Sequence, residues 1–333
     1  MGQIKYQLPP EEVLAPGHFA CPGCGATLTM RYALKALGRK TVVVIPACCW
    51  SVIDGPVPYS AAGVPVFHTA FETAASTACG VKAGLDAQGD HETTVLAFAG
   101  DGGTFDIGLQ ALSGAAERNE DFIYICYDNE AYMNTGIQRS SATPLGAWTT
   151  TTPTESPKAE KKKNIVEILA AHRIPYLATA SVAYPDDMIS KIRKAKDIRG
   201  FKFIHVFSPC PPGWKFEPED SIKISRMAIE SKVFPLIEIF HGTDYKLSKE
   251  PEGVPVRDYI KIQGRFRHLD EERIGIIQEN VDEEWERLYS KCVPTTQAHH
   301  AGSGEFQGER RSSAALSIRE TDSAKKKVQS ARR

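Results

Sequence analysis

A Gly-Asp-Gly-Gly turn and a later Asp-Asn pair carry the clearest chemistry in this chain. Asp101 offers a hard carboxylate oxygen, and Asn129, 28 positions later, offers an amide oxygen. The backbone carbonyl of Ala131 could be a third ligand, because Mg2+ takes one or two protein ligands and completes its shell with phosphate and water. Glycines around Asp101 would let the backbone approach phosphate oxygens; they are Gly100, Gly102 and Gly103. The pattern predicts a diphosphate held through a divalent metal. The alternative is a glycine-rich turn and an Asn-capped loop without a ligand.

Cysteines form the second group with metal-binding chemistry, and the chain has eight. A Cys-x-x-Cys lies in a tight Gly/Pro turn, a Cys-Cys pair follows the next predicted strand, and a distant cysteine precedes Pro-Pro-Gly-Trp. One thiolate set from these three loops suits a [4Fe–4S] cluster or a structural zinc. That set is Cys21, Cys24, Cys49 and Cys210. We expect Cys79, Cys126 and Cys292 to be core or incidental thiols.

Two short apolar runs must position the Gly-Asp-Gly and Asp-Asn residues. Residues 94–99 and 122–127 are typical of buried parallel strands, and Phe105, Leu109 and Leu112 give the stretch between them a helical period. Both runs end in the polar residues described above. Because ligands bind at the carboxyl ends of strands in an open parallel sheet, the two motifs should meet at one edge.

The whole chain repeats this alternation of strands and helices. We therefore predict an α/β fold with a mainly parallel sheet and helices on both faces. Residues 1–16 should form an extended arm, 17–240 the cofactor-binding domain and 241–293 an irregular C-terminal extension. Residues 294–333 are rich in Gly, Ser, Gln and charge, and we expect a disordered tail.

Composition excludes several classes of protein. The net charge is −1, so neither nucleic acid nor a membrane surface is indicated as a partner. No apolar run is long enough to span a membrane, and residues 1–12 do not resemble a signal peptide. We expect a protein of the reducing cytoplasm. The run 161–163, three lysines, is interpreted as a solvated charge run in preference to a phosphate or coenzyme A contact.

The stretch 129–144, NEAYMNTGIQRSSATP, makes the metal motif more specific. Together with Gly-Asp-Gly it resembles the thiamine-diphosphate-binding β subunit of the multi-subunit pyruvate:ferredoxin oxidoreductase, a 2-oxoacid oxidoreductase, over roughly residues 15–240. The resemblance implies a thiamine-diphosphate domain. Asp101, Asn129 and Ala131 would hold Mg2+, and the three glycines would line the diphosphate. Asn134 would contact the substrate in the catalytic site.

The same resemblance implies a [4Fe–4S] cluster near the thiamine, held by the four cysteines named above. The family usually has Gly-Cys where this chain has Cys48-Cys49. The interval from the Cys-x-x-Cys favours Cys49, which would also approach the cofactor.

The implied reaction is oxidative decarboxylation of a 2-oxo acid to acyl-CoA and CO2. Partners would be an α subunit carrying the pyrimidine domain and its activating Glu, γ and ferredoxin-like δ subunits, coenzyme A, and ferredoxin or another acceptor. Pyruvate is the default substrate, because the related 2-oxoglutarate enzymes tend to have Gly at the position of Asn134. Aromatic, branched-chain and oxalate-like substrates stay open. So do a non-redox thiamine enzyme with structural zinc and a non-catalytic subunit.

Overall fold

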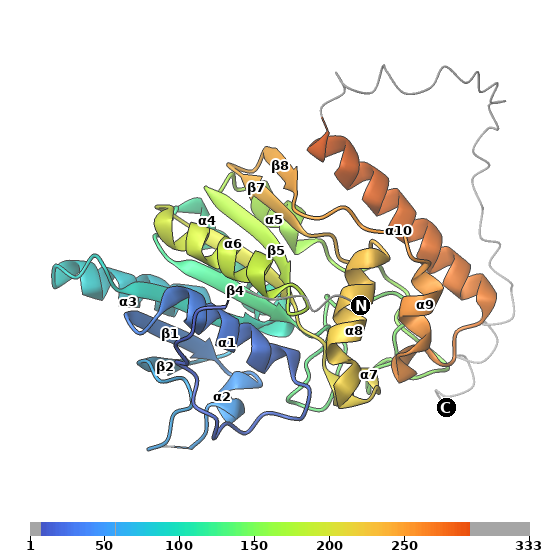
Figure 1. Cartoon of the computed structure of the whole chain (residues 1–333), viewed down its shortest axis with the longest axis horizontal. Helices are drawn as coiled ribbons and strands as arrows, with labels where there is room; N and C mark the ends of the chain where they lie inside the picture. Colours follow the sequence, from blue (N-terminus) through green and yellow to red (C-terminus); the bar gives the residue numbers. More distant parts are fainter. Residues whose placement is uncertain (1–7, 57, 294–333) are drawn as a thin grey trace, which may run out of the picture. The chain divides into compact units, whose positions relative to one another are not determined.

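The computed structural model describes residues 8–56 and 58–293. They contain one eight-stranded sheet in the order β2-β1-β3-β4-β6-β5-β7-β8 (Figure 1). The pairs from β2 to β5 are parallel, whereas β5–β7 and β7–β8 are antiparallel. The strands are β1 Thr41–Pro46, β2 Val66–Thr69, β3 Thr94–Gly100, β4 Ile123–Asp128, β5 Tyr176–Ser181, β6 Lys202–Phe207, β7 Ile237–Phe240 and β8 Asp244–Leu247.

Ten α-helices surround this sheet in the described residues. They are α1 Gly25–Leu37, α2 Trp50–Ile53, α3 Ala74–Ala87, α4 Leu109–Glu117, α5 Ile165–Ala170, α6 Pro185–Asp197, α7 Pro211–Trp214, α8 Ser221–Glu230, α9 Val256–Lys261 and α10 Glu271–Cys292. A π-helical turn, Gly102–Asp106, joins β3 to α4, and short 3-10 turns span Pro218–Asp220 and Gly264–Phe266.

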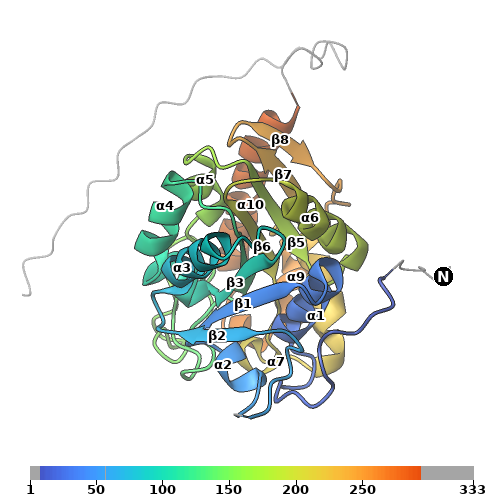
Figure 2. The ribbon, with the colours of Figure 1, turned by 90° about the vertical axis from the view of Figure 1, so that its left-hand side faces the viewer.

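Alternate strand residues point to opposite faces, and each face has its own apolar core. Val43 and Ile45 of β1 pack with α1 and α6, whereas Val44 packs on the other face with α3, α4 and α5. Figure 2 shows α1 and α6 on one side of the sheet and α3 and α4 on the other. A mainly parallel α/β fold with helices on both faces is therefore confirmed.

One local expectation differs from the structure. The helix after the glycines does not begin directly, because the chain first makes the π-helical turn and reaches α4 only at Leu109. The sheet is not parallel throughout, since β7 begins at Ile237 and runs antiparallel to β5.

The C-terminal part of the described chain continues the sheet. β7 pairs with β8, so the sheet continues beyond residue 240. The 22-residue helix α10 lies further along the chain, and Leu288 and Cys292 of this helix pack against the apolar core that contains Val44. Residues 241–293 thus contain regular elements. Near the N-terminus, Val13 and Leu14 are buried beside α1, so this part of the expected arm packs on the domain. The expected disordered tail at 294–333 lies outside the described residues. No helix in the described part combines the length and apolar character needed to cross a membrane.

Candidate functional site

The carboxyl ends of β3 and β4 bring the two predicted motifs together. The strands are parallel neighbours with Gly100 opposite Tyr127, so Asp101 and Asn129 leave the sheet at the same edge. Asp101 is fully buried, and the Ser140 hydroxyl donates a hydrogen bond to its Oδ2 at 2.5 Å. The second carboxylate oxygen, Oδ1, faces the side chain of Asn129.

Three oxygen-bearing groups meet at this point. The Asn129 side-chain amide lies against two oxygens, Asp101 Oδ1 and the Ala131 carbonyl. Turned over, the amide nitrogen would lie 2.9 Å from the first and 3.0 Å from the second and could donate to both. Oxygens that face one another repel unless a cation lies between them. With the amide oxygen turned inward instead, the same three groups offer the oxygen ligands that a hard divalent cation takes.

The glycines are needed for packing around this site. A Cβ on Gly102 would lie 2.3 Å from the Tyr132 ring, too close for any other residue. At Gly100 and Gly103 a Cβ would lie 3.3 Å from Tyr127 and from Phe71. The aromatic wall therefore restricts these positions independently of any bound phosphate.

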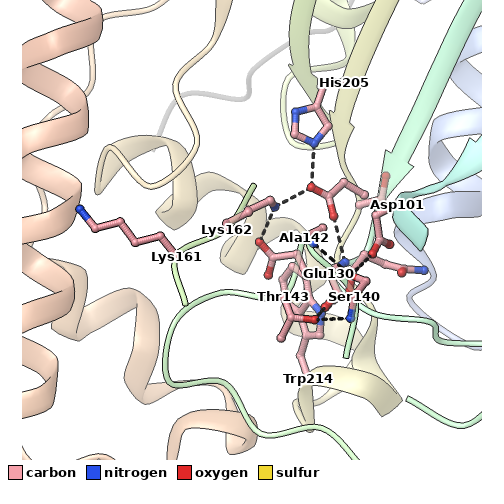
Figure 3. Close-up of polar contacts among 12 residues, drawn as sticks. Asp101, Glu130, Ser140, Ala142, Thr143, Lys161, Lys162, His205 and Trp214 are labelled. Atoms are coloured by element: carbon pink, nitrogen blue, oxygen red, sulfur yellow. Dashed lines mark hydrogen bonds and ion pairs between the residues drawn. The ribbon is translucent and has the colours of Figure 1, made fainter. Parts of the chain in front are cut away.

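A buried cluster of charged side chains supports the loop that follows β4 (Figure 3). Lys162 lies between two carboxylates, at 2.5 Å from Asp128 Oδ2 and 2.9 Å from Glu130 Oε1. His205 Nε2 lies 2.7 Å from Asp128 Oδ2, and the Arg265 guanidinium donates to Glu130 Oε2 at 2.6 Å. Since every buried charge here has an opposite partner, the cluster satisfies the condition under which buried ions are tolerated.

The same contacts shift the pKa values of Asp128 and Asp101 in opposite directions. Burial alone would raise the pKa of Asp128, but Lys162 and His205 lower it. Burial and the charge of Asp128 raise the pKa of Asp101 well above its usual range. The two carboxyl groups thus differ because Asp128 has two cationic partners, whereas the direct partner of Asp101 is the neutral hydroxyl of Ser140.

Glu130 holds the loop in an uncommon backbone conformation. Its φ is +65°, in the left-handed region that non-glycine residues rarely adopt. Its amide donates to Asp128 Oδ1 at 3.0 Å, and its carbonyl accepts from the Thr143 hydroxyl at 2.7 Å. These contacts, with the two cations on its carboxylate, fix the direction of the Asn129 and Ala131 oxygens on either side.

Arg265 connects this loop to a second one. Its guanidinium lies 3.9 Å from the centre of the Trp214 ring, and the Trp214 indole donates to the Asn129 carbonyl at 2.8 Å. Trp214 ends α7, which begins directly after Cys210. One residue of the C-terminal region therefore contacts both the oxygen pocket loop and a cysteine loop.

We predict that Arg265→Met lowers the free energy of unfolding by about 3 kcal/mol, since it leaves Glu130 buried with one cation instead of two. Arg257→Met is the matched control, because Arg257 pairs with Glu271 on the surface and should contribute no more than about 1 kcal/mol. Denaturant unfolding followed by circular dichroism measures both. Equal losses in the two variants would contradict the importance of the buried pair.

Three of the four predicted cysteines lie where helices begin, and Cys21 lies in the turn before the first of these helices. Cys24, Cys49 and Cys210 each occupy the position before the first residue of a helix, α1, α2 and α7 respectively. The loops are tied together, because the Gly25 amide donates to the Pro209 carbonyl at 3.0 Å and Ser221 donates to the Gly23 carbonyl at 2.7 Å. Trp50 also donates to the Ala26 carbonyl at 3.0 Å.

The thiols interact with one another electrostatically. Burial, then the neighbouring thiols of Cys48, Cys210 and Cys24, raise the pKa of Cys49. Burial raises the pKa of Cys210 to about 12, with Cys24 and Cys21 as further causes. Within the described residues, no three Cys, His, Asp or Glu side chains close on a point that one metal ion could occupy.

Cys48 and Cys49 differ in their surroundings. Burial raises the pKa of Cys48, and its polar neighbours include the Tyr127 hydroxyl and the backbone of Trp50, Ser51 and Gly100. Cys49 instead has the thiols of Cys24 and Cys210 as neighbours. The thiol of Cys49 therefore has the cysteines of the other loops among its neighbours.

Other predicted residues lie elsewhere. Asn134 is exposed in the turn that follows Tyr132, outside the oxygen pocket. The run 161–163 is not uniformly solvated: Lys162 is in the buried cluster, Lys163 pairs with Asp106, and Lys161 points away from the cluster (Figure 3). Phe19 and Tyr59, both exposed, flank Gly55 close to the first cysteine loop.

Sequence reasoning missed Ser140, Glu130, Lys162, His205 and Arg265. Ser140 lies in the stretch 129–144, but the sequence pattern gave no reason to expect that its hydroxyl binds Asp101. Nothing in the sequence distinguished Lys162 from its neighbours, or Arg265 from other basic residues of the extension.

Comparison with known proteins reveals relatives over most of the chain. The family described as "Thiamine pyrophosphate enzyme, C-terminal TPP binding domain" matches residues 55–206. Ketoisovalerate oxidoreductase subunit VorB of Pyrococcus horikoshii is 52% identical over 297 residues, which cover 85% of this chain and 94% of that protein. Pyruvate synthase subunit PorB of Methanothermobacter marburgensis is 52% identical over 280 residues, which cover 83% and 97% respectively.

A solved structure shares the fold. It is 2-oxoglutarate:ferredoxin oxidoreductase from Magnetococcus marinus with 2-oxoglutarate, coenzyme A and succinyl-CoA bound. The TM-score is 0.53 at 20% identity, with 67% of this chain and 82% of that chain covered. At this identity the likeness concerns the fold alone.

Proposed function

The chain belongs to the β subunits of the 2-oxoacid:ferredoxin oxidoreductases, and we propose that it binds Mg2+-thiamine diphosphate at the oxygen pocket and a [4Fe–4S] cluster at the cysteine loops. The family predicted from the sequence motifs is thereby confirmed, as is an oxidoreductase that acts with partner subunits. The observation that carries the cofactor proposal is the meeting of the Asp101, Asn129 and Ala131 oxygens in a thiamine pyrophosphate-binding domain.

Each residue of the pocket has a role in this proposal. Asp101, Asn129 and Ala131 hold Mg2+, and Ser140 occupies Oδ2 of Asp101 so that Oδ1 is left for the cation. The backbone at Gly100, Gly102 and Gly103 lines the diphosphate. When bound, thiamine diphosphate supplies the carbon nucleophile and electron sink for decarboxylation of a 2-oxo acid. Asn134, on the exposed turn, contacts the substrate.

The cysteine loops hold the cluster through Cys21, Cys24, Cys49 and Cys210. A four-iron cluster is wider than a single ion, so four thiols that do not close on one point suit it better than zinc. Helix N-termini favour negative charge on the adjacent thiolates, and three of the four sulfurs lie at such ends. Raised thiol pKa values are overcome on coordination, since metal binding deprotonates a thiol outright. When bound, the cluster accepts electrons one at a time.

The chain is proposed to work in the cytoplasm between partner subunits. An α subunit supplies the pyrimidine domain and its activating Glu, and γ and ferredoxin-like δ subunits complete the complex. Coenzyme A accepts the acyl group, and ferredoxin or another acceptor takes the electrons. No nucleic acid is proposed as a partner.

Pyruvate is the proposed substrate, and 3-methyl-2-oxobutanoate (ketoisovalerate) is a second candidate. Both are named for relatives of equal identity, 52% for ketoisovalerate oxidoreductase subunit VorB and 52% for pyruvate synthase subunit PorB. Overall sequence identity therefore does not indicate whether the 2-oxo acid carries a methyl group, as in pyruvate, or an isopropyl group, as in ketoisovalerate. The substrate pocket has walls from partner subunits as well, which enter the choice.

The experiment is substrate-dependent bleaching of the native complex, purified without oxygen. Pyruvate, 3-methyl-2-oxobutanoate, phenylglyoxylate, 2-oxoglutarate and oxalate are added separately, with and without coenzyme A, while the visible iron–sulfur absorbance is recorded. We expect pyruvate to bleach the absorbance fastest and to form acetyl-CoA. Faster bleaching by the branched acid would assign that substrate instead. A colourless, zinc-containing complex would overturn the cluster, and an iron-rich complex that no acid bleaches would overturn the proposed substrates.

A further inference from the structure

A buried tyrosine hydroxyl lies at the edge of the sheet between the oxygen pocket and the cysteine loops. Tyr127 is 1% exposed, and its hydroxyl makes no hydrogen bond of ordinary geometry within the described residues. A Cβ placed on Gly100 would lie 3.3 Å from this oxygen, so the hydroxyl lies over the backbone that leads into Asp101. Native proteins rarely leave a buried polar group unsatisfied, so this hydroxyl indicates a partner that binds at the edge.

The topology places this hydroxyl beside the Cys48–Cys49 loop. β1 and β4 are the two neighbours of β3, and all three strands run parallel. The loop after β1 therefore leaves the sheet at the same edge as Gly100 and Tyr127. The Tyr127 ring lies in the apolar core against which the side chains of Cys48 and Cys49 pack. Burial, then the neighbouring thiols of these two cysteines, raise the pKa of Tyr127.

Neighbouring rings fix the direction of the tyrosine. The Phe98 ring stacks on Tyr127 with 5.0 Å between the ring centres, and its centre lies 5.8 Å from that of Trp50. Trp50 directly follows Cys49 and begins α2. The hydroxyl is therefore held in place by the helix that starts at the cysteine pair, and it cannot turn to solvent.

The thiol of Cys48 is the polar neighbour of this hydroxyl. The backbone of Trp50, Ser51 and Gly100 also hydrogen-bonds to the Cys48 sulfur. All of these groups approach the sulfur as donors, so the thiol proton can point to another acceptor. A thiol ordinarily keeps its proton at neutral pH, and burial raises the pKa of Cys48 further. The next sulfur along the chain is that of Cys49, which has the Cys48 thiol among its neighbours.

We propose that Tyr127 and Cys48 form a hydrogen-bond relay onto the Cys49 sulfur: the hydroxyl donates to the Cys48 sulfur, and the Cys48 thiol donates to Cys49. The inference rests on the proposed function, since it requires Cys49 to be the thiolate ligand of the cluster. Hydrogen bonds to ligand sulfurs stabilise the more negative, reduced cluster, so the relay raises its reduction potential. Tyr127 and Cys48 are thus positioning residues that act through Cys49.

The test is a redox titration of the native complex, purified without oxygen and followed by low-temperature electron paramagnetic resonance. The part of the reduced signal that Cys210→Ser removes belongs to this subunit, and that part is followed. We expect Tyr127→Phe and Cys48→Ala each to lower the reduction equilibrium constant of this cluster about five- to tenfold, a typical effect of one lost hydrogen bond. For one electron this equals a shift of about 40–60 mV to more negative potential.

Two further variants test the order of the relay. Cys48→Ser keeps a donor in place of the thiol, so it should shift the potential less than Cys48→Ala. The double variant Tyr127→Phe/Cys48→Ala should shift the potential no more than Cys48→Ala alone, because the hydroxyl acts only through Cys48. Fully additive shifts would contradict a relay.

Tyr124→Phe is the matched control. Tyr124 is a buried tyrosine of the same strand, but its ring lies in the core on the opposite face, and its hydroxyl hydrogen-bonds with that of Thr104 at 3.1 Å. Its loss should leave the potential of the cluster unchanged.

The outcomes separate this proposal from the proposed function. If Tyr127→Phe and Cys48→Ala keep the wild-type potential while this subunit's cluster is present, the relay is wrong and the cluster assignment stands. If Cys210→Ser removes no part of the signal, the cluster assignment fails and the relay with it. Loss of thiamine diphosphate from Tyr127→Phe at an unchanged potential would assign the hydroxyl to the oxygen pocket and would also overturn the relay.

Discussion

Replacing Asp101 by asparagine is expected to abolish the binding of Mg2+-thiamine diphosphate while the chain stays folded. The carboxylate is the only anionic group among the three oxygens that face one another, so its loss should weaken cation binding by at least about 100-fold, a value typical of a lost charged ligand interaction of about 3 kcal/mol. Because burial and Asp128 raise the pKa of Asp101, the fold already disfavours the charged form of this side chain, and the neutral asparagine has nearly the same shape. Cofactor content after gel filtration and calorimetric titration with Mg2+ measure the effect.

Asp187→Asn is the control for that experiment. Burial also raises the pKa of Asp187, but this residue lies in α6 and pairs with Lys191 at 2.8 Å. It should keep the full cofactor content. If Asp101→Asn kept the wild-type cofactor content, Asp101 would not be a ligand of the cation. If both variants lost the same amount of cofactor, the loss would result from impaired folding.

Cys210→Ser is expected to eliminate the part of the iron–sulfur signal that comes from this subunit, whereas Cys48→Ser should retain it. A serine hydroxyl is a poor replacement for a thiolate, and Cys210 shares its neighbourhood with Cys24 and Cys21. Cys48 faces the Tyr127 hydroxyl and backbone amides instead. Iron content and the low-temperature electron paramagnetic resonance spectrum of the dithionite-reduced complex report the cluster.

Cys48 and Cys49 are adjacent, so a comparison of their serine variants is an internal control for the effect of the substitution. Cys49→Ser should lose the cluster like Cys210→Ser, although Cys48 and Cys49 are neighbours in the chain. Loss of iron in Cys48→Ser with retention in Cys49→Ser would reverse the choice between them. Retention of iron in all three variants would mean that the cluster lies elsewhere in the complex.

The oxygen pocket was predictable because its geometry follows from topology. Once the runs before Asp101 and Asn129 are recognised as adjacent parallel strands, their ends must meet at one edge of the sheet. The apolar character of these runs and the polar residues after them are both visible in the sequence. The order of the eight strands could not be predicted, because it depends on long-range pairing that no local sequence pattern encodes.

The buried charge cluster could not be predicted for a different reason. Lys162 reaches Glu130 from a loop 32 positions away, and Arg265 reaches it from 135 positions away. A lysine in a run of three and an arginine in a charged extension resemble surface residues until the fold buries them. Buried ion pairs of this kind depend on tertiary packing and not on spacing.

The exposed rings of Phe19 and Tyr59 have a consequence for handling the protein. These side chains are 62% and 76% exposed, and both lie next to Gly55. Apolar groups gathered next to a functional loop usually belong to a contact with another molecule. A chain expressed without its companions would present them to water and be prone to self-association, so co-expression of all subunits is the rational route to a soluble preparation.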